Sequence, residues 1–171
     1  MIKKTWLMFF AGSAFLALST APQARPDENT GTALHIDIPT RLEKANVVID
    51  MAHLVFGGDD PFALGDIHLL AADFRAWNTK GTIVVVLHGD AAYLVLNDES
   101  YNAVRHVQTG NRYSGLLNEL MKQGVQLELC GATAKGNHWG NANLLPGVKV
   151  NTNAMVRLTQ LEQEGYQMIY Q

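Results

Sequence analysis

The single cysteine of the chain, Cys130, stands at the end of a short apolar segment and is followed by Gly131 and Ala132. The nucleophilic form of cysteine is the thiolate, and the pKa of a thiol falls near cations and near exposed backbone N–H groups. The sequence therefore indicates a reactive thiol at Cys130. A buried structural cysteine is the alternative, because free cysteine is among the most buried residue types.

Histidines and one lysine are candidate partners for this thiol. His88 follows the strongest strand signal of the chain, whereas Lys135 and His138 lie in the Gly- and Asn-rich stretch after Cys130. Each can bring positive charge to a thiolate, and a histidine can also exchange a proton near neutral pH. We therefore expect Cys130 and His88 to carry the chemistry. The residues expected to bind substrate are Gly89, Gly131, Ala132 and His138.

Metal-binding patterns are weak in this sequence. None of the six histidines is paired with another at the i, i+4 spacing of a helical zinc site. One cysteine excludes both an intrachain disulfide and a zinc site built from several cysteines. We therefore expect no metal and no cofactor, although a scattered site of Cys130 with His88 or His138, as in a metal or redox sensor, stays open.

Short apolar runs and helical stripes alternate along the chain. Strands are expected where apolar and β-branched residues cluster, and helices where apolar residues recur every three or four positions. The predicted strands cover residues 46–51, 82–87, 125–129, 148–150 and 166–170, and the predicted helices cover residues 61–77, 113–121 and 155–161. Residues 98–112 are predicted to be irregular or partly helical, and residues 132–146 to form a loop.

The helix starts carry recognisable signals. Asp59 or Asp60 is expected to cap the first helix, with Pro61 at its first position. Asn151 or Asn153 is expected to cap the last helix, because an asparagine oxygen can accept a hydrogen bond from a free backbone N–H.

The alternation of strands and helices predicts the fold class. It is typical of a single α/β domain, here a three-layer sandwich with a mostly parallel sheet. Ligands of such sheets bind beyond the carboxyl ends of the strands. His88 and Cys130 follow the second and third predicted strands, so they converge at one edge if these strands are neighbours.

Length and composition agree with this interpretation. The chain has 171 residues, of which 47% are hydrophobic and 17% are charged, which suits one globular domain. The 13 basic and 16 acidic side chains leave a net charge of −3. This balance argues against a nucleic-acid partner, because phosphate binding needs a basic surface.

The N-terminal residues 1–21 are predicted to be a cleaved signal peptide. Lys3 and Lys4 precede an apolar run over residues 6–18, and small residues follow at 19–21. A membrane anchor is the alternative, but the run is shorter than the ~20 residues that span a bilayer. We therefore expect no stable membrane span and a periplasmic or secreted protein.

The rest of the chain divides into a linker and a domain. Residues 22–44 contain several prolines and polar residues and are predicted to be a linker. Residues 45–171 are predicted to form the α/β domain. Ala24 offers a second cleavage point.

Three segments of this chain resemble the DsrE/DsrF-like family. They are residues 83–101 (IVVVLHGDAAYLVLNDESY), residues 124–133 (GVQLELCGAT) and residues 145–170, with their Pro-Gly-Val and closing Gly-Tyr. The resemblance implies a compact α/β sandwich, a homotrimer or homohexamer, and a role in sulfur metabolism as a persulfide carrier or sulfurtransferase. It also implies that Cys130 is the carrier cysteine and that His88 matches a strand-end histidine of many relatives.

Two functions follow from these observations. In the first, an exported sulfur-handling protein accepts sulfane sulfur on Cys130 and passes it to a small sulfur compound or a thiol-bearing partner protein. His88 and the N–H groups near Gly131 and Ala132 would stabilise the anion. The alternative is a non-catalytic oligomeric module that binds a ligand or a partner, with Cys130 as a structural residue.

Overall fold

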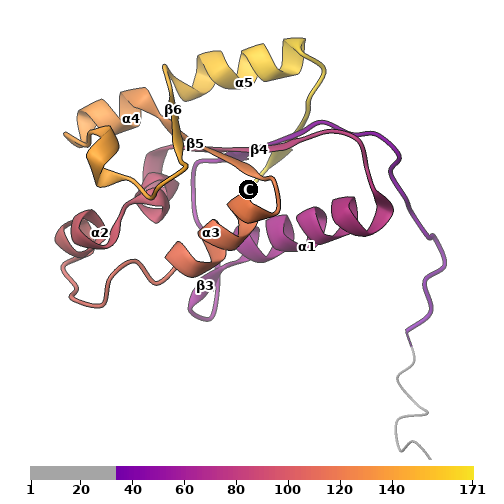
Figure 1. Ribbon diagram of the computed structural model, residues 1–171, viewed down its shortest axis with the longest axis horizontal. Coiled ribbons are helices and arrows are strands. Elements are labelled where there is room, and N and C mark those ends of the chain that lie inside the picture. Colours follow the sequence, from indigo (N-terminus) through magenta and orange to yellow (C-terminus); the bar gives the residue numbers. More distant parts are fainter. Residues whose placement is uncertain (1–33) are drawn as a thin grey trace, which may run out of the picture. The chain divides into compact units, whose positions relative to one another are not determined.

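A five-stranded parallel sheet lies at the centre of the computed structural model, which describes residues 34–171 (Figure 1). The chain divides into two units after Pro39, and the elements described below belong to the second unit, Thr40–Gln171. The predicted signal peptide, residues 1–21, lies outside the described residues, as does the first part of the predicted linker.

The sheet is built from strands that are far apart in sequence. The strands are β1 (Val47–Met51), β4 (Ile83–Leu87), β5 (Gln126–Cys130), β6 (Lys149–Asn151) and β7 (Gln167–Tyr170). They lie in the order β6-β5-β4-β1-β7, and each neighbouring pair is parallel. All residues of the central strand β4 are buried, as expected of a strand that is covered on both faces. The predicted parallel sheet is therefore confirmed.

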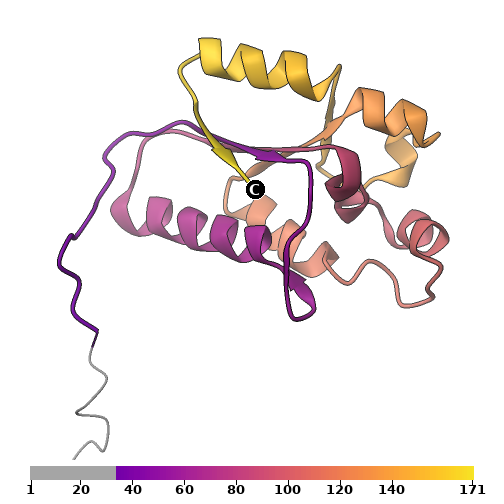
Figure 2. The same cartoon turned by 180° about the vertical axis from the view of Figure 1, so that it is seen from behind.

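Helices cover both faces of the sheet and make the domain a three-layer α/β sandwich (Figure 1, Figure 2). α1 (Phe62–Trp77) and α3 (Ser114–Lys122) pack on one face, and α5 (Ala154–Gln163) packs on the other. Buried residues recur along α1 at helical spacing, so one stripe of this helix faces the sheet.

Alternate residues of the strands contribute to two separate cores, because successive side chains of a strand point to opposite faces. Ile49 and Val85 belong to the larger core, together with residues of α1 and α3. Val48 and Val84 belong to the smaller core, together with residues of α5. Cys130 is part of the smaller core, so its side chain lies on the face of the sheet that α5 covers.

Two segments hold short helices that apolar periodicity did not reveal. α2 (Asp98–Arg105) makes the first part of residues 98–112 helical, and its N-terminus is capped by the side chain of Asn97. α4 (Gly131–Gly136) occupies the start of residues 132–146, so the loop prediction is wrong there. α4 is too short to show an apolar stripe. Two 3-10 helices, η1 (Gly89–Val95) and η2 (Asn141–Asn143), are the other helical elements among residues 34–171.

The predicted cap of the first helix is also wrong. β2 (Phe56–Gly57) and β3 (Asp60–Pro61) form a small antiparallel hairpin, and α1 begins directly after it. The backbone of Asp60 is paired with that of Gly57 in this hairpin, so Asp60 does not cap the helix. Pro61 occupies the N-cap position, and no side-chain hydrogen bond caps α1. At α5 the expectation is confirmed for Asn153, whose side chain accepts a hydrogen bond of 2.9 Å from the N–H of Met155.

Candidate functional site at the carboxyl edge of the sheet

The ends of β4 and β5 bring His88 and Cys130 together at one edge of the sheet. The two strands are neighbours, and Leu87 pairs with Leu129 in their register. His88 directly follows Leu87, and Cys130 directly follows Leu129. Both residues keep an extended backbone, so they form the next pair along the two strands. The convergence that the sequence predicted is therefore present.

The sulfur of Cys130 is buried among hydrogen-bond donors, and the residue is only 4% exposed. The backbone N–H of Ala154, at the start of α5, donates to Sγ at 3.2 Å. Burial raises the pKa of the thiol, but hydrogen bonds from the N–H and hydroxyl of Thr133 and from the N–H groups of Ala154 and Ala132 outweigh it. The net result is a pKa below the ordinary thiol value, which favours the thiolate.

The junction of β5 and α4 creates this set of donors. Gly131 follows Cys130 and opens α4, so the next backbone N–H groups turn toward the sulfur. A Cβ atom at Gly131 would collide with the backbone carbonyl oxygen of Asn151 on β6. Only glycine lets the chain turn this close to the neighbouring strand. Ala132 therefore contributes its N–H to the thiol, whereas Gly131 makes the turn possible.

His88 is held by a carboxylate that the sequence analysis missed. Its Nε2 lies 2.7 Å from Oδ1 of Asp50, and the two side chains are 22% and 16% exposed. Asp50 belongs to β1, the neighbour of β4 on the side away from β5. The available signal was a single carboxylate inside the otherwise apolar run of β1.

Thr133 connects the two strand ends, and it too was missed. Its hydroxyl oxygen accepts a hydrogen bond of 3.4 Å from the N–H of Gly89, and the same hydroxyl donates to the sulfur of Cys130. Gly89 has a φ of 53°, a conformation that glycine adopts without strain. Gly89 thus lies at the site through its backbone, one contact away from the thiol.

His138 is not brought to the thiol. It is exposed, follows the end of α4 and has a left-handed backbone with a φ of 58°. Among residues 34–171, no hydrogen bond joins it to Cys130. The neighbouring Trp139 packs against the larger core, whereas Cys130 belongs to the smaller one.

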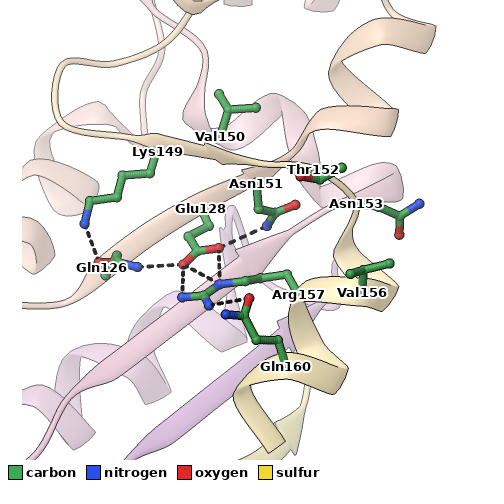
Figure 3. A pocket seen from close by; sticks show the side chains of 10 residues that line it. All are labelled: Gln126, Glu128, Lys149, Val150, Asn151, Thr152, Asn153, Val156, Arg157 and Gln160. Carbon is green, nitrogen blue, oxygen red and sulfur yellow. Dashed lines mark hydrogen bonds and ion pairs between the residues drawn. The ribbon is translucent and has the colours of Figure 1, made fainter. Parts of the chain in front are cut away.

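A polar cavity of about 470 Å³ lies between β5, β6 and α5, on the same face of the sheet as Cys130 (Figure 3). Its base holds Glu128, which is 3% exposed and stands two residues before the cysteine. Arg157 donates to this carboxylate from Nε at 3.0 and 3.1 Å and from Nη2 at 2.9 Å. Gln126 and Asn151 each add a further hydrogen bond (Figure 3).

This ion pair, with Glu128 buried and Arg157 partly buried, joins three elements next to the thiol. Burial raises the pKa of Glu128, but the hydrogen bonds from Arg157, Asn151 and Gln126 together lower it by more than burial raises it. The pKa of Glu128 therefore lies below the ordinary glutamate value. Both carboxylate oxygens are used by neighbouring side chains. We therefore regard Glu128 as a residue that fixes β5 against α5 rather than as a free acid or base.

Within the described residues, no group of three or more histidine, cysteine, aspartate or glutamate side chains is placed to hold a metal ion. Across residues 34–171, no helix has both the length and the apolar character needed to cross a bilayer.

The protein belongs to the class of parallel three-layer α/β domains, and it carries a hydrogen-bonded thiol at the carboxyl edge of its sheet. The DsrE/DsrF-like family matches residues 62–170, and the chain belongs to this family. No curated protein matches the chain in sequence.

Two solved structures share the fold. One is MTH1491 from Methanobacterium thermoautotrophicum, a protein of unknown function, with 22% identity and a TM-score of 0.55 over 75% of this chain and 98% of that one. The other is the ychN protein from E. coli, with 19% identity and a TM-score of 0.55 over 74% of this chain and 99% of that one. Both similarities concern the fold alone.

Proposed function

We propose that the protein is a sulfur carrier in which Cys130 accepts sulfane sulfur as a persulfide and passes it on. The family is linked to sulfur relay. The observation that carries the proposal is the position of the Cys130 sulfur at the sheet edge, among donors that lower the pKa of the thiol. A thiolate is the form that attacks sulfur.

The loading step is a simple displacement. The Cys130 thiolate attacks the outer sulfur of a sulfane donor, such as thiosulfate or a low-molecular-weight persulfide. A new S–S bond forms on Cys130 while the S–S bond of the donor breaks, and the donor leaves with the bonding electron pair as sulfite or as a thiolate. No external oxidant is consumed. The N–H groups of Ala132 and Ala154 are suited to hold the anion before and after this step.

Intact-mass spectrometry of the native protein tests the loading step. After incubation with thiosulfate or polysulfide, we expect a mass gain of one or more sulfur atoms that a reductant removes. A Cys130→Ser variant should show no gain. Equal sulfur uptake by this variant would contradict the proposal.

The burial of Cys130, at 4% exposure, favours a second candidate function, a non-catalytic module that binds a ligand or a partner. In that case the thiol is structural and reacts with iodoacetamide only after unfolding. A carrier thiol reacts in the folded protein. The ratio of alkylation rates in the native and the urea-unfolded chain distinguishes the two functions.

We further propose that residues 1–21 direct export and that the carrier works in the periplasm or outside the cell. The support is the charge and apolar pattern of those residues. Sequencing the N-terminus of protein recovered from the exported fraction of a bacterial host tests this. An uncleaved chain in the cytoplasm would contradict it.

We also propose that the protein is a homotrimer or homohexamer. Several large apolar side chains are exposed on two surfaces, with Met155 and Val156 on α5 at 70% and 63%, and Phe62 at the start of α1 at 58%. Exposed apolar patches commonly mark interfaces. Light scattering on a sizing column should give three or six times the chain mass, and a monomer at all concentrations would contradict the proposal.

A further inference from the structure

We propose that Asp50 is a positioning residue, which holds His88 so that its other ring nitrogen takes the proton of the thiol that receives sulfur from Cys130. This inference rests on the proposed function and concerns its second half, the delivery of sulfur. Asp50 lies on β1, outside the residues 62–170 that match the family, so the inference comes from the geometry of this chain.

The three side chains lie on one face of the sheet. In β1, Val48 belongs to the smaller core, so Asp50, two residues later, points to the same face. In β4, Val86 belongs to the same core, so His88 follows on that face too, in agreement with its contact to Asp50. Cys130 is also part of this core.

The strand order places the same residues in a row. β1, β4 and β5 are consecutive in the sheet, so Asp50, His88 and Cys130 stand at the ends of three neighbouring strands. This is the order of a carboxylate, an imidazole and a nucleophilic thiol in which the carboxylate orients the imidazole.

The Asp50–His88 contact selects one form of the imidazole. An ionised carboxylate only accepts hydrogen bonds, so Nε2 of His88 must carry the hydrogen that it shares with Oδ1 of Asp50 at 2.7 Å. Nδ1 is then the nitrogen that can accept a proton. The pair is mostly shielded from water, with exposures of 22% and 16%. In a second pair, His53 and Asp90 lie 3.5 Å apart and are 79% and 84% exposed. This exposed pair does not fix the tautomer of its histidine in the same way.

The delivery step balances as follows. An acceptor thiol gives its proton to Nδ1 of His88 and becomes a thiolate. This thiolate attacks the outer sulfur of the Cys130 persulfide, a new S–S bond forms on the acceptor, and the S–S bond on Cys130 breaks. Cys130 leaves as the thiolate that its N–H donors stabilise, and His88 then releases its proton to water.

A double-mutant cycle tests whether Asp50 acts through His88. The chains are the native protein, Asp50→Asn, His88→Gln and the double variant, each loaded from thiosulfate and then mixed with dithiothreitol as the acceptor. We expect Asp50→Asn to slow delivery roughly 10- to 100-fold, which is less than the roughly 10²- to 10⁴-fold that a general base typically contributes, because His88 itself is still present. We expect the double variant to be no slower than His88→Gln. If Asp50 acts only through His88, its loss has no further effect once His88 has been replaced. Asp90→Asn is the matched control and should deliver at the native rate.

Nitrogen NMR of His88 gives a readout that does not depend on activity. The native protein should show hydrogen on Nε2, and Asp50→Asn should show a mixture of tautomers with an unchanged far-UV spectrum. The inference is overturned if Asp50→Asn delivers at the native rate, if the two substitutions slow delivery multiplicatively, or if the tautomer is unchanged. If the native chain takes up no sulfur, the proposed function fails, and this inference fails with it.

Discussion

At the scale of single residues, the site depends on what surrounds one sulfur atom. Cys130 is buried, which by itself would keep the thiol protonated. Backbone N–H groups from two segments, together with the Thr133 hydroxyl, reverse that effect. These hydrogen-bond donors belong to the backbone and to one short side chain. They are therefore already in place before a sulfane-sulfur compound binds.

Replacing Thr133 with valine should weaken this effect without changing the shape of the site. The pKa of the Cys130 thiol is then expected to rise, so less thiolate is present at neutral pH. We expect iodoacetamide to react roughly three- to tenfold more slowly at pH 7, because a single intramolecular hydrogen bond contributes about 0.5–1.5 kcal/mol. The rate should recover at high pH.

The control for this experiment is Thr159→Val, an exposed threonine of α5 whose hydroxyl bonds only to its own helix. Its alkylation profile should match that of the native chain. A Thr133→Val profile that coincides with the native one at every pH would show that the hydroxyl does not influence the thiol.

At the scale of elements, the site depends on the tight passage from β5 into α4. The helix begins on the residue directly after the cysteine, against the neighbouring strand β6. The position of Ala132 and Thr133, and therefore the hydrogen bonds to the sulfur, follows from this turn.

Gly131→Ala should disturb that passage. The added methyl group meets the backbone of Asn151, which cannot move without distorting β6. We expect a loss of roughly 1–3 kcal/mol in the free energy of unfolding, the usual cost of overpacking. Urea denaturation followed by circular dichroism measures it.

Gly136→Ala is the matched control, because the same methyl group would meet nothing within 4 Å there. Its stability should be unchanged or higher by up to about 1 kcal/mol, since alanine favours helix more than glycine. Equal stabilities for the two variants would mean that the contact at Gly131 does not matter.

At the scale of the whole domain, α5 is the single long helix within residues 34–171 that covers the thiol-bearing face, and it is anchored by an ion pair whose carboxylate is buried. Glu128 on β5 and Arg157 on α5 are joined by several hydrogen bonds (Figure 3). The N-terminus of the same helix supplies the Ala154 N–H to the sulfur. A change in the seating of α5 is therefore expected to reach the thiol.

This ion pair predicts a dependence of stability on pH. The pKa of Glu128 is lower in the folded chain than in the unfolded one, so its contribution is complete above the ordinary glutamate value of about 4.3 and is lost as the pH falls through the lower folded value. Glu128→Gln should cost roughly 3 kcal/mol at pH 7, because Arg157 loses its charged partner. Its urea midpoint should then vary less between pH 5 and pH 3 than the native midpoint does.

The control for the ion pair is Glu162→Gln, at an exposed position of α5. It should keep both the native stability and the native pH dependence. If Glu128→Gln were as stable as the native chain at pH 7, the ion pair would not be what anchors α5.

The strands and the convergence of His88 with Cys130 could be predicted from the sequence, because apolar runs mark buried strands and parallel strands end at a common edge. Asp50 could not, because its partner depends on β1 lying next to β4, and strand order leaves no local pattern. Thr133 was hidden for a similar reason. It lies in α4, which is too short to be recognised from its apolar pattern. The hydrogen bond of its hydroxyl to the sulfur could therefore not be predicted from the sequence.

The most direct test of the account follows one labelled sulfur atom through the protein. The native chain is loaded from thiosulfate that carries a heavy isotope in its outer sulfur, freed of donor, and mixed with an acceptor thiol. We predict that the label appears first on Cys130 and then on the acceptor as a persulfide, and that Cys130→Ser transfers none. Label that reaches the acceptor equally well with Cys130→Ser, or never leaves the native chain, would contradict the assignment of this protein as a sulfur carrier.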